Sequence, residues 1–455
     1  MAFACIPILV ALSGKANIIT LLTGVSHERL NVLHRWVAWM SFGLSLVHTI
    51  PFFYASIYDE GDGGDQRVKS EFYTNKMRGA NEYSGVPPLA MLFGLCILSL
   101  PPLRNKFYES FYAVHILLAI TYLGLLFWHA ANVNDSWAYL WATLAVWLAS
   151  WAARTFYYTR PLNIHSAWFV PSQATLVPLP GAVTRIEVWP PEDFAHSPAQ
   201  HVFLRFTALA PLDNHPFTIV SAPMDSGSQP SPLVFLARTH AGFTARLARY
   251  ALANVNGKDE AASTPVWIDG PYGGVSRSFE TRYDTLVLLA GGTGISACLP
   301  WMLSAREGRL KRVVLVWAVR RAEALAWVTG ELEAVGKGEV EVVVQMHITG
   351  EVEEGKDGKE VGEGLGKEAR VEVAGSEGKS GFAERLAALG PSLEGRPVMS
   401  EVLSKHVRAG ERTMVFACGP EGFRVDVANA VAGAQRRVLS GECVEIGMHI
   451  ETFGW

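Results

Sequence analysis

Two apolar runs share a pattern that constrains the fold more than any other feature. Residues 34–48 read HRWVAWMSFGLSLVH and residues 115–129 read HILLAITYLGLLFWH, so each run has a histidine at both ends, fourteen residues apart. Fourteen residues make about four helical turns, a rise of about 21 Å, and return to nearly the same helix face. An ionisable side chain inside an apolar span is costly, so the pattern predicts a functional partner for each imidazole.

The uneven distribution of apolar residues predicts a membrane half followed by a soluble half. The chain has 455 residues, of which 49% are hydrophobic and 18% charged. Long apolar runs gather in 1–155, whereas 160–455 reads as an ordinary α/β protein. A membrane span needs about 20 mostly apolar residues. The candidate spans are roughly 3–22, 33–54, 86–101, 109–131 and 137–153.

Charges in the short loops orient these spans. The loop at 132–135 has no lysine or arginine, and the other short loops are basic, which favours a cytosolic C-terminal half. The basic side chains are Arg29, Arg35, Arg104, Lys106, Arg154 and Arg160. In this orientation His34 and His115 lie near the cytosolic side, and His48 and His129 near the opposite side.

Two facing helices with this spacing would build two stacked histidine pairs. A haem iron takes one axial ligand from each side, and helix bundles form such sites from facing helices. A single histidine at a helix end is usually only a hydrogen-bonded interfacial residue, but the repeated spacing favours ligation. His27 lacks the spacing and is expected in a loop.

Charge and cysteine content exclude other classes of protein. The net charge is −4, which gives no reason to expect nucleic-acid binding. The five cysteines are scattered, without a CxxC pair, so neither a disulfide framework nor a zinc site is expected.

Residues 160–280 alternate short apolar runs with turns, which predicts a small antiparallel barrel. Within it, HPFTIVSAP starts at His215, and a strand of this kind can hold a flavin: Phe217 could pack on the ring and Thr218 could bond its edge. In AGFTARL, Gly242 and Thr244 open an apparent helix whose free N–H groups suit a pyrophosphate. The alternative for each motif is an ordinary turn.

The segment TLVLLAGGTGISACLPWM, 285–302, predicts a strand, a glycine-rich turn and a helix. Gly291, Gly292 and Gly294 would let the backbone approach a dinucleotide phosphate; a tight turn alone is the alternative. A second strand, 312–320, ends in Arg320 and Arg321, and cations here suit the 2′-phosphate of NADPH, with solvated arginines as the alternative.

Three features complete the C-terminal half. The strand TMVFACGP, 413–420, places Cys418 and Gly419 at its carboxyl end, where such sheets bind ligands. The tail ends in aromatic residues that could cover the flavin or remain disordered. Residues 350–380 are rich in Gly, Glu and Lys, which predicts a loop insertion without a catalytic part.

Together these motifs resemble the fungal ferric reductases, the metal-reducing branch of the ferric reductase and NADPH oxidase superfamily. The segments that carry the resemblance are LTGVSHERLNVLHRWVAW with HTIP, FYAVHILLAITYLGLLFWH, HPFT, DGPYG, AGGTGIS, ACGP and the aromatic C-terminus. The resemblance implies a multidomain membrane protein: an α-helical transmembrane haem-binding bundle (1–155), a β-barrel FAD-binding domain (160–280) and a ferredoxin reductase-like α/β nucleotide-binding domain (281–455).

The resemblance also implies roles for residues. His34 with His115 would ligate the inner haem b, and His48 with His129 the outer haem b. The FAD residues would be His215, Pro216, Phe217, Thr218, Gly242 and Thr244, with Trp455 shielding the flavin. The NADPH residues would be Gly291, Gly292, Thr293, Gly294, Cys418 and Gly419. Arg320 is added to them from its place after the second strand, and Thr293 and Cys418 are the candidate catalytic residues.

Two departures from the family pattern are visible. Family members carry a further membrane helix before this segment, so the chain is expected to be truncated at its N-terminus. The glycine turn continues with Ile295-Ser296-Ala297, where the family often has a proline; little effect is expected.

The implied function is electron transfer from cytosolic NADPH through FAD and two haems to an extracytosolic acceptor. Ferric or cupric chelates are the expected acceptors, with membrane lipid as surroundings and an iron permease and oxidase uptake system downstream. The plasma membrane is the expected location, with the vacuolar membrane as alternative. The rival functions are an NADPH oxidase that makes superoxide and a non-catalytic haem-binding scaffold.

Overall fold

The computed structural model divides the chain into two compact units, Met1–Asn163 and Ile164–Trp455. The described residues are 2–14, 18–23, 25, 27–58, 66, 69, 82–106, 108–153, 171–190, 194–211, 213–223, 231–254, 261–275, 279–305, 309–333, 340–350 and 392–451. The predicted insertion at 350–380, apart from Gly350, and the aromatic tail, Phe453 and Trp455, lie outside them.

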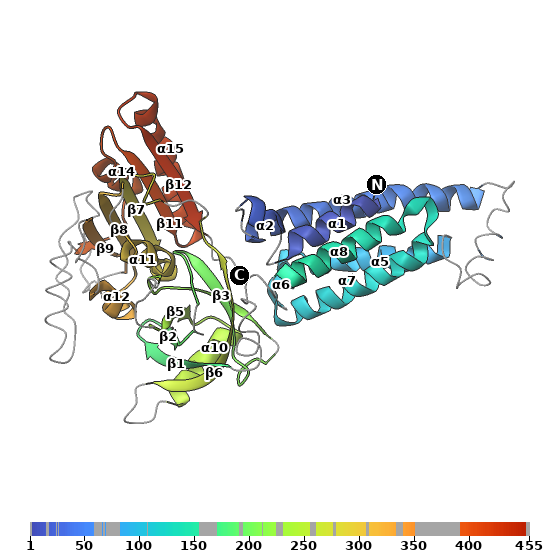
Figure 1. Ribbon diagram of the computed structural model, residues 1–455, viewed down its shortest axis with the longest axis horizontal. Coiled ribbons are helices and arrows are strands. Elements are labelled where there is room, and N and C mark those ends of the chain that lie inside the picture. The colour runs from blue at the N-terminus through green and yellow to red at the C-terminus, as the bar shows by residue number, and fades with distance from the viewer. Residues whose placement is uncertain are drawn as a thin grey trace, which may run out of the picture. The chain divides into compact units, whose positions relative to one another are not determined.

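The first unit is a bundle of helices that run side by side (Figure 1). Helix α1 packs against α3 and α8, while α5 packs against α3 and α7. The elements are α1 (Ala2–Ser13), α2 (Ile18–Thr23), α3 (His27–Tyr58), α5 (Glu82–Leu98), α6 (Pro101–Lys106), α7 (Tyr108–Ala130), η2 (Val133–Asp135) and α8 (Trp137–Ala153).

The outside of this bundle is apolar. Trp36, Leu117 and Trp141 are each more than half exposed, and many other large apolar side chains share that exposure. A soluble bundle buries such surface, so the pattern is typical of helices that face lipid. Among the described residues, Ser110–Ala130 is the one stretch long and apolar enough to cross a membrane by itself.

The helices agree with the predicted spans only in part. The predicted spans at 33–54, 109–131 and 137–153 fall largely within α3, α7 and α8, but the predicted span at 3–22 is divided between α1 and α2. The expectation that His27 lies in a loop is wrong, because α3 begins at His27. Polar residues with good helix propensity let this helix continue beyond its apolar stretch.

In the second unit, the first sheet is antiparallel and strongly curved. Its order is β4-β3-β6-β1-β2-β5. The Val220 amide, which lies two residues after β4, donates to the Val234 carbonyl of β5, 2.8 Å away, and so links the two outermost strands. Helix α10 (Phe243–Ala253) contacts β1 and β2. The strands are β1 (Ser172–Leu179), β2 (Val183–Val188), β3 (Gln200–Arg205), β4 (His215–Thr218), β5 (Leu233–Arg238) and β6 (Ala262–Gly273).

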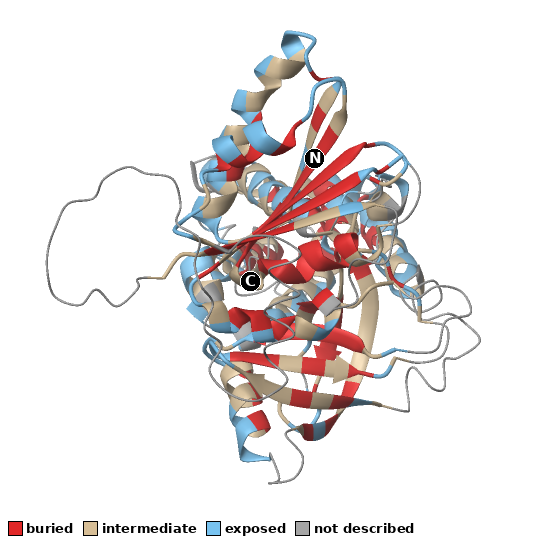
Figure 2. Ribbon diagram, turned by 90° about the vertical axis from the view of Figure 1, so that its left-hand side faces the viewer, coloured by how far each residue is buried: buried red, intermediate tan, exposed pale blue. Residues whose placement is uncertain are grey.

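The second sheet is parallel, in the order β10-β9-β8-β7-β11-β12. Its central strands are buried along their length (Figure 2), as expected for apolar runs covered on both faces. The strands are β7 (Thr285–Gly291), β8 (Arg312–Val319), β9 (Glu341–Ile348), β10 (Ser392–Glu394), β11 (Arg412–Cys418) and β12 (Glu445–Glu451). The helical elements are η5 (Gly292–Gly294), α11 (Ile295–Leu303), η6 (Ala322–Trp327), α12 (Thr329–Glu333), α14 (Met399–His406) and α15 (Glu421–Leu439).

Polar contacts join the two sheets of the second unit. Arg185 of β2 donates to both carboxylate oxygens of Glu331 on α12, at 3.1 and 2.6 Å. The Trp327 indole donates to the Pro180 carbonyl at 2.8 Å. Apolar side chains of both sheets also share one core, so the two sheets form a continuous structure.

Candidate functional site

The four repeated histidines form two pairs between α3 and α7. The ring centroids of His34 and His115 are 6.4 Å apart, and those of His48 and His129 are 6.5 Å apart. The fourteen-residue spacing therefore places each imidazole of one helix opposite an imidazole of the other, at two levels.

These separations suit a metal between two axial imidazoles. A metal–nitrogen bond of about 2 Å puts each ring centroid about 3 Å from the metal, so two coaxial rings should lie about 6 Å apart. Among the described residues, no group of three or more His, Cys, Asp or Glu side chains could hold a bare ion. A porphyrin supplies the four remaining ligands itself, so the donor set fits haem.

Three of the four imidazoles have a hydrogen-bond partner at Nδ1. The His34 Nδ1–H donates to the Leu9 carbonyl at 2.9 Å. His115 Nδ1 lies 3.4 Å from Ser99 Oγ, and His129 Nδ1 lies 3.0 Å from Ser84 Oγ. Such contacts orient a ligating ring and leave Nε2 for the metal. Sequence reasoning missed all three partners, because they come from other helices.

The nucleotide residues meet at the carboxyl ends of adjacent parallel strands. Gly291 ends β7 and Gly292 to Gly294 follow it. Arg320 follows β8, and Cys418 ends β11 with Gly419 directly after it; β8 and β11 lie on either side of β7. A side chain at Gly294 would overlap the Cys418 carbonyl, and one at Gly291 would lie 2.8 Å from the Pro420 ring. The glycines are needed for this close approach, so the turn has a packing role, and its predicted ligand role stays a prediction.

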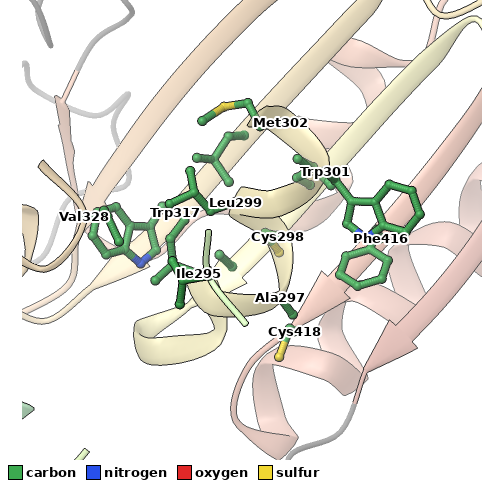
Figure 3. Packing of buried hydrophobic residues seen from close by; sticks show 14 of the residues in the cluster. Ile295, Ala297, Cys298, Leu299, Trp301, Met302, Trp317, Val328, Phe416 and Cys418 are labelled. Atoms are coloured by element: carbon green, nitrogen blue, oxygen red, sulfur yellow. The ribbon is translucent and has the colours of Figure 1, made fainter. Parts of the chain in front are cut away.

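Helix α11 is held from both sides behind this turn. Figure 3 shows its apolar residues between Trp317 and Phe416, with Ala297 directed toward Cys418. The Trp317 indole donates to the Gly292 carbonyl at 2.9 Å. Gly292 has a φ of 57°, a conformation that glycine adopts without strain. This hydrogen bond therefore ties the turn to β8 at the carboxyl end of the parallel strands.

The candidate catalytic residues differ in environment. Thr293 is half-buried in the turn, whereas Cys418 is only 1% exposed. Burial, and then the charge of Glu451, raise the pKa of the Cys418 thiol. The protonated thiol is therefore favoured over the thiolate at neutral pH, and the role of Cys418 at the nucleotide site stays a prediction.

Arg320 and Arg321 are exposed beyond β8. Within the described part of the chain, neither guanidinium is seen to pair with a carboxylate. Both can therefore reach an anionic ligand.

The predicted flavin strand is β4. His215 stacks on Phe243 with centroids 3.8 Å apart, and Phe217 is buried beside the same ring in the core of the first sheet. Pro216 and Thr218 alternate with them and belong to the opposite face of the strand. His215 and Phe217 thus position the strand, and the contacts predicted for the flavin ring stay predictions.

The predicted pyrophosphate site lies where α10 begins. Gly242 precedes the helix with a φ of 67°. The Thr244 hydroxyl accepts from the His240 amide at 2.9 Å, so it stabilises the turn before the helix. Trp455, predicted to cover the flavin, lies outside the described residues.

Comparisons with known proteins agree with this architecture. Three family models match in order: "Ferric reductase like transmembrane component" over residues 1–126, "FAD-binding domain" over 169–276 and "Ferric reductase NAD binding domain" over 283–432. These matches assign to the chain a ferric reductase like transmembrane component, an FAD-binding domain and an NAD-binding domain. The resemblance to the fungal ferric reductases, expected from the sequence, is confirmed.

Curated relatives carry matching names. A "Probable cell surface ferric reductase kap2" of Aspergillus oryzae is 34% identical over 73% of this chain and 44% of its own length. A "Ferric/cupric reductase transmembrane component 7" of Saccharomyces cerevisiae is 28% identical over 100% of this chain and 74% of its own. The chain thus covers less than half of the first relative.

A solved ferredoxin NADP+ reductase from Neisseria gonorrhoeae, with bound FAD and NADP, is 14% identical, with a TM-score of 0.37. The match covers 61% of this chain and 97% of that one.

Proposed function

We propose that this chain passes electrons from cytosolic NADPH across a membrane to ferric or cupric chelates. The observation that carries the proposal is the repeated histidine pair, 6.4 and 6.5 Å between centroids at two levels of one bundle. The names of the relatives support metal chelates as acceptors.

Each part of the chain would have a defined task. His34 with His115, and His48 with His129, would hold two haem b groups. The curved sheet would serve as the FAD-binding barrel, and the turn after β7 would bind NADPH beside Cys418 and Gly419. When bound, these cofactors supply hydride and one-electron chemistry, and the protein supplies binding, orientation and spacing.

The loop charges support the orientation. The basic short loops favour a cytosolic C-terminal half. The inner pair is then His34 with His115 and the outer pair His48 with His129. We place the chain in the plasma membrane, with a permease and oxidase uptake system as the consumer of reduced metal.

The decisive experiment is a reduced-minus-oxidised spectrum of membranes after NADPH is added. A low-spin haem signal is expected, and its absence in well-expressed protein would defeat the proposal. His48→Ala should abolish reduction of an impermeant ferric chelate but leave NADPH-to-FAD transfer intact. Chelate reduction at the normal rate in this variant would contradict the outer-pair assignment.

Superoxide production is the rival function. The same cofactor sites would serve both reactions, so the acceptor must be tested directly. If superoxide dismutase removes all ferric-chelate reduction, the acceptor is dioxygen rather than the chelate. A haem-binding scaffold without catalysis would show haem but no NADPH oxidation.

A further inference from the structure

The histidine pairs differ in what holds their second ring nitrogen. Both imidazoles of the first pair have a partner at Nδ1: the Leu9 carbonyl for His34 and the Ser99 hydroxyl for His115. In the second pair, His129 has Ser84, whereas no described residue is bonded to His48, whose nearest aromatic contact is Phe52 at 4.8 Å. The two histidine pairs therefore differ in the number of hydrogen bonds at Nδ1: two in the first pair and one in the second.

The donor in these contacts follows from simple chemistry. A carbonyl can only accept, so His34 Nδ1 must carry the proton. The Ser99 hydroxyl donates to the Leu95 carbonyl at 2.6 Å, so toward His115 it can only accept. A ring with Nδ1 protonated presents its Nε2 lone pair to a metal, and the acceptor at Nδ1 makes that nitrogen more basic.

Both serines come from α5 or the residue directly after it, and α5 contributes no predicted ligand. Ser84 lies in the first turn of α5 and is fully buried, and Ser99 follows the last residue of α5. The backbone of α5 approaches the His129 imidazole next to Ser84: a side chain at Gly85 would lie 3.1 Å from His129 Cε1. One hydroxyl from within α5 and one from the residue after it thus contact the two histidine pairs, Ser84 at His129 and Ser99 at His115.

We propose that Ser84 and Ser99 are positioning residues that set the reduction potentials of the two haems. A more basic axial imidazole stabilises ferric over ferrous iron and lowers the potential. The inner pair has two of these hydrogen bonds and the outer pair has one. The reduction potential of the inner haem is therefore lower than that of the outer haem. Electrons then move energetically downhill from the inner to the outer site. This inference rests on the proposed function.

The test is a spectroelectrochemical titration of the full chain in membranes, with the two haems fitted as two one-electron components. Ser99→Ala should raise the lower potential and narrow the gap, whereas Ser84→Ala should raise the higher potential and widen it. We expect at least a threefold change in the ratio of ferric to ferrous haem at fixed potential, about 28 mV at about 59 mV per decade.

Ser45→Ala is the matched control, because the Ser45 hydroxyl bonds only to its own helix at the Ser41 carbonyl. Ser99→Thr retains the hydroxyl and should restore the wild-type potential. If Ser84→Ala loses haem, Ser84→Cys keeps a similar volume with a weaker acceptor and should give a smaller upward shift. In a His48→Ala background, Ser99→Ala should still shift the single remaining haem.

The outcomes separate this inference from the proposed function. If two haems are present and reduced by NADPH, but both serine variants titrate like Ser45→Ala, the serine inference is overturned and the function stands. Equal shifts of both haems in each variant would also overturn it. If wild-type membranes contain no haem, the proposed function and this inference fall together.

Discussion

At the scale of single residues, the nucleotide site depends on positions where a side chain has no room. Gly294 lies against the Cys418 backbone, and Gly419 lies 3.2 Å, measured from its would-be Cβ, from the Gly291 backbone. Two loops from neighbouring strands can approach this closely only because both carry glycine. A methyl group at Gly294 can be accommodated only if the Cys418 backbone moves.

Gly294→Ala should therefore disturb NADPH binding and stability together. We expect at least a tenfold rise in the KM for NADPH and a loss of about 1–3 kcal/mol in the free energy of unfolding, because backbone must move. Gly330→Ala is the control, since Gly330 lies in α12 with open space around it. Steady-state NADPH oxidation would measure the effect, and equal behaviour of the two variants would refute it.

Arg320→Ala tests the preference for NADPH. Loss of an exposed cation near the 2′-phosphate should raise the KM for NADPH about tenfold and leave that for NADH unchanged, because only NADPH carries the phosphate. Arg249→Ala, on α10, should change neither KM. A parallel rise for both nucleotides would assign Arg320 a structural role instead.

At the scale of elements, the ion pair between β2 and α12 joins the two sheets of the second unit. The Arg185 and Glu331 side chains are 17% and 9% exposed, whereas Glu187, which also pairs with Arg185, is 33% exposed. Burial alone would lower the pKa of Arg185, but the hydrogen bonds and charge of Glu331 and Glu187 raise it overall. Glu331, which is better shielded from solvent than Glu187, should therefore contribute more to the free energy of unfolding.

Glu331→Gln should lower the free energy of unfolding by about 1.5–3 kcal/mol, because a charge-assisted double hydrogen bond is lost. Glu187→Gln should cost less than about 1 kcal/mol, as is usual for a more exposed pair. Thermal unfolding of the full chain, followed by flavin fluorescence, would compare the two. Equal effects would contradict a dominant role for the α12 contact.

At the scale of the whole molecule, the proposed direction of electron flow makes the two histidine levels non-equivalent. His115→Ala should prevent reduction of either haem by NADPH, because in the proposed order of transfer electrons reach the outer haem only through the inner one. His129→Ala should leave the inner haem reducible. Spectra of NADPH-treated membranes measure both, with FAD reduction as the control. An outer haem reduced normally in His115→Ala would disprove the order.

Much of this architecture could be predicted from the sequence, because periodicity and glycine placement are local properties. The fourteen-residue histidine spacing implied the two levels of α3 and α7, and the strand–turn–helix at 285–302 implied β7 and α11. The start of α3 at His27 was mispredicted, because helix propagation does not stop where apolar residues stop. The break between α1 and α2 was also missed.

The sequence by itself determined which side chains are the candidates for the proposed chemistry: four spaced histidines, a glycine turn and the cysteine–glycine end of a strand. Only the tertiary structure decided what surrounds them. The histidines are contacted by the Leu9 carbonyl of α1, by Ser84 of α5 and by Ser99, which follows α5. Cys418 lies against Gly294 because β11 is the neighbour of β7 in the sheet. Contacts between distant segments depend on how the helices and strands pack, and no local pattern of residues specifies that packing.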